Sequence, residues 1–209
     1  MSDIINFGSA FRSAWAMFRT HAATFVSISF VFFVITIALD SVDGKGDAQT
    51  LSDLVTTLFS FFAAYIMTRL SIGAIRGDAS LWKDVFSFHW GEFAWYVVAS
   101  IIAFALYVAG FLALIIPGII LIVRLSLMNF ALIDEDLAPI DAIKRSWELS
   151  RGHFWKLFVA GLIVIGLNIV GMLALGIGLI ISTPLSFLFS AYIYDRLREA
   201  SVPMVAESH

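Results

Sequence analysis

The chain has 209 residues, of which 60% are hydrophobic and 14% are charged, and its formal net charge is -3. A soluble domain usually contains about a quarter charged residues, so this composition predicts a chain that lives in a bilayer. The absence of cysteine excludes disulfides, thiolate metal sites and cysteine nucleophiles. The N-terminal residues lack a signal-peptide pattern, and we therefore expect the spanning helices themselves to direct insertion.

Residues 3–20 predict an amphipathic helix that lies at a membrane surface. Apolar residues recur there at three- and four-residue spacing, which gathers them on one helical face. The polar residues fall on the other side. The two faces hold Ile4, Phe7, Phe11, Trp15 and Phe18, and Asn6, Ser9, Arg12, Ser13 and Arg19, respectively.

Six long apolar runs follow, and most of them approach or exceed the roughly 20 residues that a helix needs to cross a bilayer. A second amphipathic piece, residues 80–90, precedes the third run. The sequence predicts an all-α, polytopic membrane protein with six transmembrane helices. The runs cover residues 22–39, 51–75, 93–116, 117–133, 154–175 and 179–194.

A third amphipathic segment, residues 140–157, leads into the fifth run and has the strongest separation of faces. Its long basic side chains flank the boundary, where their stems can lie along apolar surface. Such a pattern is typical of a basic helix at a membrane surface. The apolar face holds Ile140, Ile143, Trp147 and Phe154, the opposite face Asp141, Arg145 and Glu148, and the boundary Lys144 and Arg151.

The three amphipathic segments suggest a repeat of one interfacial helix plus one transmembrane hairpin. We divide a single domain, residues 1–200, into units 3–76, 79–133 and 137–198, followed by a tail, 201–209. The alternative is that any basic amphipathic helix before a span looks alike. The alignment pairs Arg12 with Lys144, Trp15 with Trp147, Arg19 with Arg151, His21 with His153, Gly91 with Gly152, Phe93 with Phe154, and Arg69 with Arg124.

The arginines and lysines predict the orientation, because loops on the cytoplasmic side carry an excess of them. With the N-terminus inside, only Lys45 lies in an outer loop. Both termini are then cytoplasmic. The cytoplasmic set is Arg12, Arg19, Arg76, Lys83, Lys144, Arg145, Arg151, Lys156, Arg196 and Arg198.

Arg124 is the sharpest candidate for a functional residue, because it stands in the apolar run ILIVRLSLM. A charge facing lipid costs a few kcal/mol, so Arg124 must pair, face water or lie near the interface. Its depth depends on whether the chain turns at Pro117-Gly118 or near Gly110. One reading is a site for an anionic headgroup, shared with Arg69, since a guanidinium fits phosphate geometry. The other is a structural arginine bonded to helix ends and neighbouring loops.

Other polar residues give weaker signals. The basic set Lys144, Arg145, Arg151 and Lys156 fits anionic lipid or a simple topology signal. Trp15, Trp147 and Trp155 are typical interface anchors. The cluster 134–136 of three carboxylates suggests a solvated loop more than a metal site, and Asn129 and Asn168 suggest interhelical hydrogen bonds. Glycines every five residues in 161–176 do not share a helical face. We expect no catalytic, metal-binding or cofactor-binding residue, and no cofactor, because no known motif occurs.

Residues 117–127, PGIILIVRLSL, an acidic turn, and residues 142–158, AIKRSWELSRGHFWKLF, together carry a family resemblance. The chain resembles the membrane domain of the glycerophosphoryl diester phosphodiesterase type and related uncharacterised bacterial inner-membrane proteins. The resemblance implies a helical membrane domain with no established activity of its own. The soluble phosphodiesterase barrel of that family is absent, so its catalysis does not carry over.

Three functions compete. The first is a non-enzymatic inner-membrane module that binds anionic phospholipid or organises the envelope. The second is a small transporter or channel with Arg69 and Arg124 along a polar path. The third is an accessory subunit for a separate enzyme or transporter. Few polar groups lie inside the apolar runs, which favours the first and third. Expected partners are membrane lipids and a protein or second copy, without nucleic acid.

Overall fold

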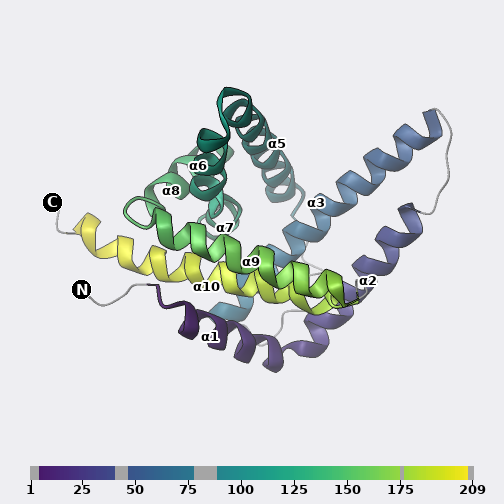
Figure 1. The fold of residues 1–209 in the computed structure, drawn as a ribbon, viewed down its shortest axis with the longest axis horizontal. Helices are drawn as coiled ribbons and strands as arrows, with labels where there is room; N and C mark the ends of the chain where they lie inside the picture. The colour runs from purple at the N-terminus through teal and green to yellow at the C-terminus, as the bar shows by residue number, and fades with distance from the viewer. Residues whose placement is uncertain (1–4, 41–46, 78–88, 175–176, 207–209) are drawn as a thin grey trace.

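The computed structural model describes residues 5–40, 47–77, 89–174 and 177–206, and the regular structure in these ranges is entirely helical (Figure 1). The predicted all-α class is therefore confirmed. The expected amphipathic piece 80–90 and Lys45 lie largely outside the described residues. The helices are α1 (Phe7–Thr20), α2 (Ala22–Asp40), α3 (Asp47–Arg76), α5 (Trp90–Ala113), α6 (Ile115–Leu125), α7 (Met128–Asp134), α8 (Pro139–Leu149), α9 (Phe154–Leu173) and α10 (Leu179–Ala206).

Five helical stretches of the described chain are long and apolar enough to cross a membrane. They agree with the first five predicted spans. The sixth predicted span coincides with the first part of α10, and this helix is not among the five. Six spans thus stay a prediction. The five stretches are Ala22–Leu39, Thr50–Arg76, Trp90–Ala113, Ile115–Asp134 and Phe154–Leu173.

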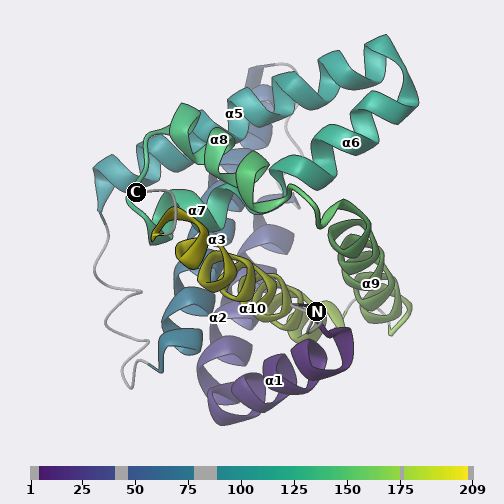
Figure 2. The ribbon, with the colours of Figure 1, turned by 90° about the vertical axis from the view of Figure 1, so that its left-hand side faces the viewer.

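The helix α10 lies at the centre of the molecule, where it packs against α1, α2, α3, α7, α8 and α9. Figure 2 shows α1, α3, α7 and α9 around it. The hairpins point in different directions in Figure 1, with α2–α3 towards the upper right, α5–α6 upward and α9–α10 to the right. Fully buried side chains at this centre include Phe25, Tyr65, Leu188, Phe189 and Tyr194.

The α5–α6 hairpin reverses at Leu114, which has extended backbone angles between the two helices. Neither predicted turn position is therefore correct. Pro117 stands in the first turn of α6, where proline is tolerated because its missing N–H is not needed. Gly110 and Gly118 instead let the helices approach, since a Cβ on Gly110 would lie 3.0 Å from the Cα of Gly118. Arg124 falls in the last turn of α6, about 14 Å along the helix axis from its start.

Two isolated asparagines join neighbouring helices, as the sequence predicts. The Asn168 amide nitrogen on α9 donates to the Ser186 hydroxyl on α10 at 3.0 Å, and its oxygen accepts from Ser182 at 3.3 Å. On α7, the Asn129 amide donates to the Tyr96 hydroxyl of α5 at 3.2 Å. Close packing accompanies the α9–α10 bonds, because a Cβ on Gly171 would lie 2.3 Å from the Ser182 hydroxyl.

The helices α1 and α8 bury a few large apolar residues, among them Phe18 and Leu149, together with a set of small ones. Ala10 and Ala14 of α1 are fully buried, and so are Ala142 and Ser146 of α8, which occupy the aligned positions. Small side chains allow each helix to approach its neighbours closely. Part of each predicted apolar face is exposed, namely Phe11 and Trp15 on α1 and Ile140 and Trp147 on α8, as suits a helix at a membrane surface. The repeat itself stays a prediction, because the helix expected in its middle unit lies mostly outside the described residues.

Candidate functional site

The Arg124 side chain sits among α6, α8 and α9. Its Nη1 donates to the hydroxyl of Ser150, the C-cap residue of α8, at 3.2 Å. Its guanidinium carbon lies 5.1 Å from the centre of the Trp147 ring and 5.9 Å from that of Phe154. The Nε is buried and has no hydrogen-bond partner. Among the described residues, Arg124 forms no ion pair.

The backbone at Arg124 is fixed as well, because its carbonyl oxygen accepts a 2.7 Å hydrogen bond from the buried Ser146 hydroxyl. This contact uses a carbonyl from the last turn of α6, which has no partner inside its own helix. The α8 helix thus holds both the backbone and the side chain of Arg124. These bonds agree with a structural role, and the absence of a carboxylate leaves the headgroup reading open.

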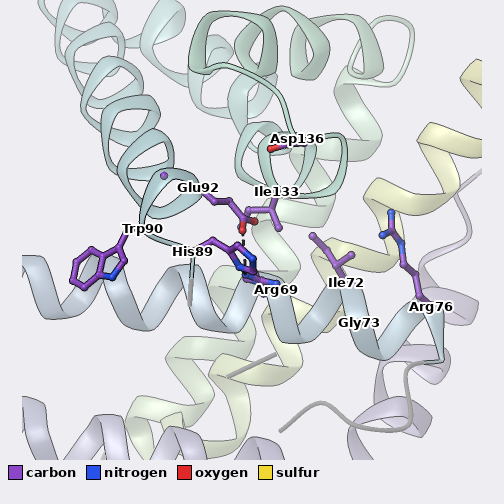
Figure 3. Close-up of a pocket in the computed structure, with 10 residues that line it drawn as sticks. Arg69, Ile72, Gly73, Arg76, His89, Trp90, Glu92, Ile133 and Asp136 are labelled. Carbon is purple, nitrogen blue, oxygen red and sulfur yellow. Dashed lines mark hydrogen bonds and ion pairs between the residues drawn. The ribbon is translucent and has the colours of Figure 1, made fainter. Parts of the chain in front are cut away.

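Arg69 lies elsewhere, between α3 and the start of α5 (Figure 3). Its Nη1 is 3.0 Å from the Glu92 carboxylate and 3.2 Å from the His89 Nδ1. The same nitrogen donates to the Tyr65 hydroxyl, which in turn donates to Glu92 at 3.0 Å. Both charged side chains are largely buried, with 17% and 18% exposed. The described contacts of Arg69 lie on α3 and at the start of α5, whereas those of Arg124 lie on α8 and α9, so within the described residues the two arginines do not form one shared site.

The predicted repeat nevertheless aligns the two arginines. The alignment that pairs Gly91 with Gly152 also pairs His89 with Ser150, and these residues contact Arg69 and Arg124, respectively. It places His153 opposite Glu92. In each case an arginine on the second helix of one hairpin, α3 or α6, contacts a residue just before the first helix of the next hairpin, α5 or α9. Within the part of the chain that the structure describes, Arg69 meets a carboxylate there and Arg124 does not.

A cavity of about 690 Å³ opens beside Arg69, among the ends of α3 and α7 and the start of α5 (Figure 3). Its wall carries charges of both signs, an exposed indole and two isoleucines. Sequence reasoning missed the role of Glu92, although Glu92 is the only carboxylate between Trp90 and Ile133. The lining residues are Arg69, Ile72, Gly73, Arg76, His89, Trp90, Gly91, Glu92, Ile133 and Asp136.

The acidic cluster at 134–136 differs from the solvated loop that the sequence suggests. The Asp134 side chain is only 2% exposed and pairs with Arg76 of α3 and, at 2.7 Å, with Arg198 of α10. The Tyr194 hydroxyl donates to the same carboxylate at 3.0 Å. These partners lie far from Asp134 in the sequence, and the sequence alone therefore suggests a solvated loop. In the structure, Asp134 connects α7 with α3 and α10. Only Asp136 of this cluster is exposed.

The basic set of α8 and α9 is not a common surface. Arg145 is held by the Glu135 carboxylate at 2.9 Å and by the Ser201 hydroxyl at 3.2 Å. Lys144 forms an exposed pair with Asp141 at 3.1 Å, and Arg151 is exposed.

On α10, burial and then the charge of Glu199 raise the pKa of the Asp195 carboxyl, while Arg198 opposes this shift.

The three predicted interface anchors are all exposed in the described structure. Trp15 and Trp147, which the repeat aligns, are 42% and 37% exposed, and Trp155 is more exposed. Exposed indoles beside apolar helices suit the boundary between lipid and water. Trp147 differs from the other two because it also contacts Arg124.

Within the described ranges, no group of three or more His, Asp or Glu side chains is placed to hold a metal ion. No protein-family model, no curated protein and no solved structure matches the chain. The helical structure and the five long apolar stretches place the chain in the class of all-α membrane-embedded proteins. The resemblance to a phosphodiesterase membrane domain stays a prediction.

Proposed function

We propose that the chain is a non-enzymatic, integral inner-membrane protein that binds anionic phospholipid through Arg124. The observation that carries this proposal is the charge of Arg124, which no carboxylate of the described residues balances. A partly buried charge without a counter-ion is costly, and an anionic ligand relieves that cost. Membrane lipids are the anions present at the highest local concentration.

The surroundings of Arg124 suit a phosphate group. A guanidinium has five N–H donors in a fixed fork, and Ser150 uses only one of them. The aromatic rings of Trp147 and Phe154 restrict the plane of the guanidinium, which reduces the entropy lost on binding. Such a fork binds a phosphate through two parallel hydrogen bonds. The hydroxyl of Ser150 supports the geometry of the arginine.

The proposed orientation has both termini in the cytoplasm, with the bacterial inner membrane as the location. The exposed apolar residues of α1 and α8 then lie at the cytoplasmic interface, on the side where anionic headgroups attract basic segments. Arg124 contacts the end of α8, so a headgroup in this layer can reach it. This placement rests on the distribution of arginine and lysine.

The competing functions have less support. In a transporter, the polar groups inside the spans line a path. Here Asn129 and Asn168 bind neighbouring helices instead. An accessory subunit for a separate enzyme or transporter remains the alternative, and the large apolar surface of the splayed hairpins would accommodate a partner or a second copy.

Native mass spectrometry from mild detergent tests the proposal directly. We expect the wild type to retain phosphatidylglycerol or cardiolipin, and Arg124→Gln to lose about tenfold of this retention, as removal of a charge-assisted contact predicts. Arg151→Gln is the matched control, because it removes an exposed charge of the same sign nearby. We expect this control to retain the lipid.

Three outcomes distinguish the alternatives. If folded Arg124→Gln keeps the wild-type lipid profile, Arg124 is structural and the proposal fails. If both variants lose lipid equally, the attraction is a general effect of basic charge and the specific site is wrong. A stable copurifying protein, together with an unchanged lipid profile, would favour the accessory subunit.

A further inference from the structure

A groove of about 160 Å³ lies between α9 and α10, beside the segment that follows α6. Four of its apolar residues are buried, whereas Gly161 on α9 is exposed at its edge. This part of α9 belongs to the apolar span Phe154–Leu173, so the groove opens towards hydrocarbon. The buried four are Leu127, Leu157, Ala160 and Ile193.

The rest of the lining adds little polarity. Val164 is the remaining apolar residue, and two serines, Ser126 and Ser190, complete the wall. The Ser126 hydroxyl donates to the carbonyl oxygen of Val123 at 2.9 Å, so it is satisfied by its own backbone. A groove with this lining suits hydrocarbon more than a polar ligand.

The groove continues the Arg124 site along one face of α9. The ring of Phe154 lies 5.9 Å from the Arg124 guanidinium carbon, and Phe154 is followed at helical spacing by Leu157, Gly161 and Val164. Residues three and four apart share a helix face, so these four form one stripe. The stripe extends about 15 Å along the helix axis. Arg124 lies at its beginning, and the groove occupies the rest.

The direction of this stripe matches that of a phospholipid. Phe154 begins the span, and Ser150, which binds Arg124, stands just before it at the end of α8. A phosphate on Arg124 therefore lies where the span begins. A chain that follows the stripe from Leu157 to Val164 runs away from the headgroup and into the hydrocarbon layer.

We infer that this groove holds an acyl chain of the phospholipid whose phosphate binds Arg124. The inference rests on the proposed function and narrows the ligand to a molecule with both an anionic headgroup and a long hydrocarbon chain. Free phosphate or a deacylated headgroup contacts Arg124 alone. The chain leaves one apolar environment for another, so its contribution comes from packing contacts and is small.

Gly161→Leu places a side chain in the groove without disturbing the backbone. A Cβ on Gly161 would meet no atom within 4 Å, and its neighbours on the same face, Leu157 and Val164, both line the groove. Gly166→Leu is the matched control. A Cβ on Gly166 is equally free of contacts, but Gly166 is rotated by about 140° around the helix axis and does not line the groove.

The test uses nanodiscs that contain long-chain phosphatidylglycerol with a diazirine in one acyl chain. We expect native mass spectrometry to show about threefold lower retention of this lipid in Gly161→Leu, the size of one packing contact in a membrane. Gly166→Leu should retain the wild-type amount. Photolysis should label residues 157–164 of the wild type and of Gly166→Leu, and this labelling should disappear in Gly161→Leu.

The outcomes separate this inference from the proposed function. Wild-type retention and labelling in Gly161→Leu would overturn the inference, even where Arg124→Gln loses the lipid. Retention of the lipid by Arg124→Gln would overturn the proposed function, and labelling of residues 157–164 in that variant would show a chain held without the headgroup. A wild-type dimer that Gly161→Leu dissociates, with lipid retention unchanged, would overturn the inference and assign the groove to a second copy.

Discussion

Arg69 and Arg124, which the predicted repeat aligns, have different partners in the structure. Each stands near the end of a helix that returns through its hairpin, and each contacts the aligned residue at the start of the next hairpin, His89 or Ser150. Arg69 also has Glu92 at 3.0 Å. Arg124 has the rings of Trp147 and Phe154 but no carboxylate among the described residues.

The difference separates a closed interaction from one that can accept a ligand. In a pair of partly buried opposite charges, each group compensates the charge of the other. Removal of one partner leaves a partly buried charge without a counter-ion, which is strongly destabilising. An arginine held only by a hydroxyl and two rings keeps its orientation but also its net charge. The arginine without a carboxylate is therefore the better candidate for an anionic ligand.

Glu92→Gln should have the largest effect, because it leaves Arg69 without its counter-ion. We expect a loss of about 2 kcal/mol in the free energy of unfolding, measured by denaturant titration in mixed micelles. Glu148→Gln is the control. Glu148 is exposed, and its ion pair with Arg145 is long, at 3.9 Å, so its loss should cost little. Equal stability of the two variants would contradict the view that Glu92 closes the Arg69 interaction.

His153→Glu should convert Arg124 to the arrangement of Arg69, because His153 aligns with Glu92. The new carboxylate would compete with an anionic headgroup, and we expect retention of phosphatidylglycerol to fall about fivefold. His21→Glu, at the aligned position after α1, serves as the control. Unchanged lipid retention in His153→Glu would show that the position is not equivalent or that Arg124 binds no headgroup.

Trp147→Leu should have the smallest effect, and its comparison with Trp15→Leu is informative. Both indoles are about two-fifths exposed, but only Trp147 contacts an arginine. We expect Trp147→Leu to destabilise the protein by about 0.5–1 kcal/mol more than Trp15→Leu, the size of one cation–π contact. Denaturant titration in mixed micelles measures the difference. Equal losses would mean that Trp147 acts only as an interface anchor.

Local composition was enough to predict the helical class and five of the proposed spans, because apolar runs of this length have few alternatives in a membrane. It also identified Asn129 and Asn168 as interhelical residues, since an amide in an apolar run needs a nearby partner. The Arg124 residue stood out for the same reason. These predictions depend on local composition alone.

Which charges are balanced became visible in the packed helices and not along the chain. The Asp134 carboxylate looked solvated because Arg76 and Arg198 are 58 and 64 residues away in sequence. Glu92 and Arg69 meet across two helices, so no local pattern reveals their pair. The hairpin turn at Leu114 was also hidden, because Pro117 fits both a turn and the first turn of a helix. Long-range ion pairs depend on packing, and packing is the property that periodicity along the chain does not encode.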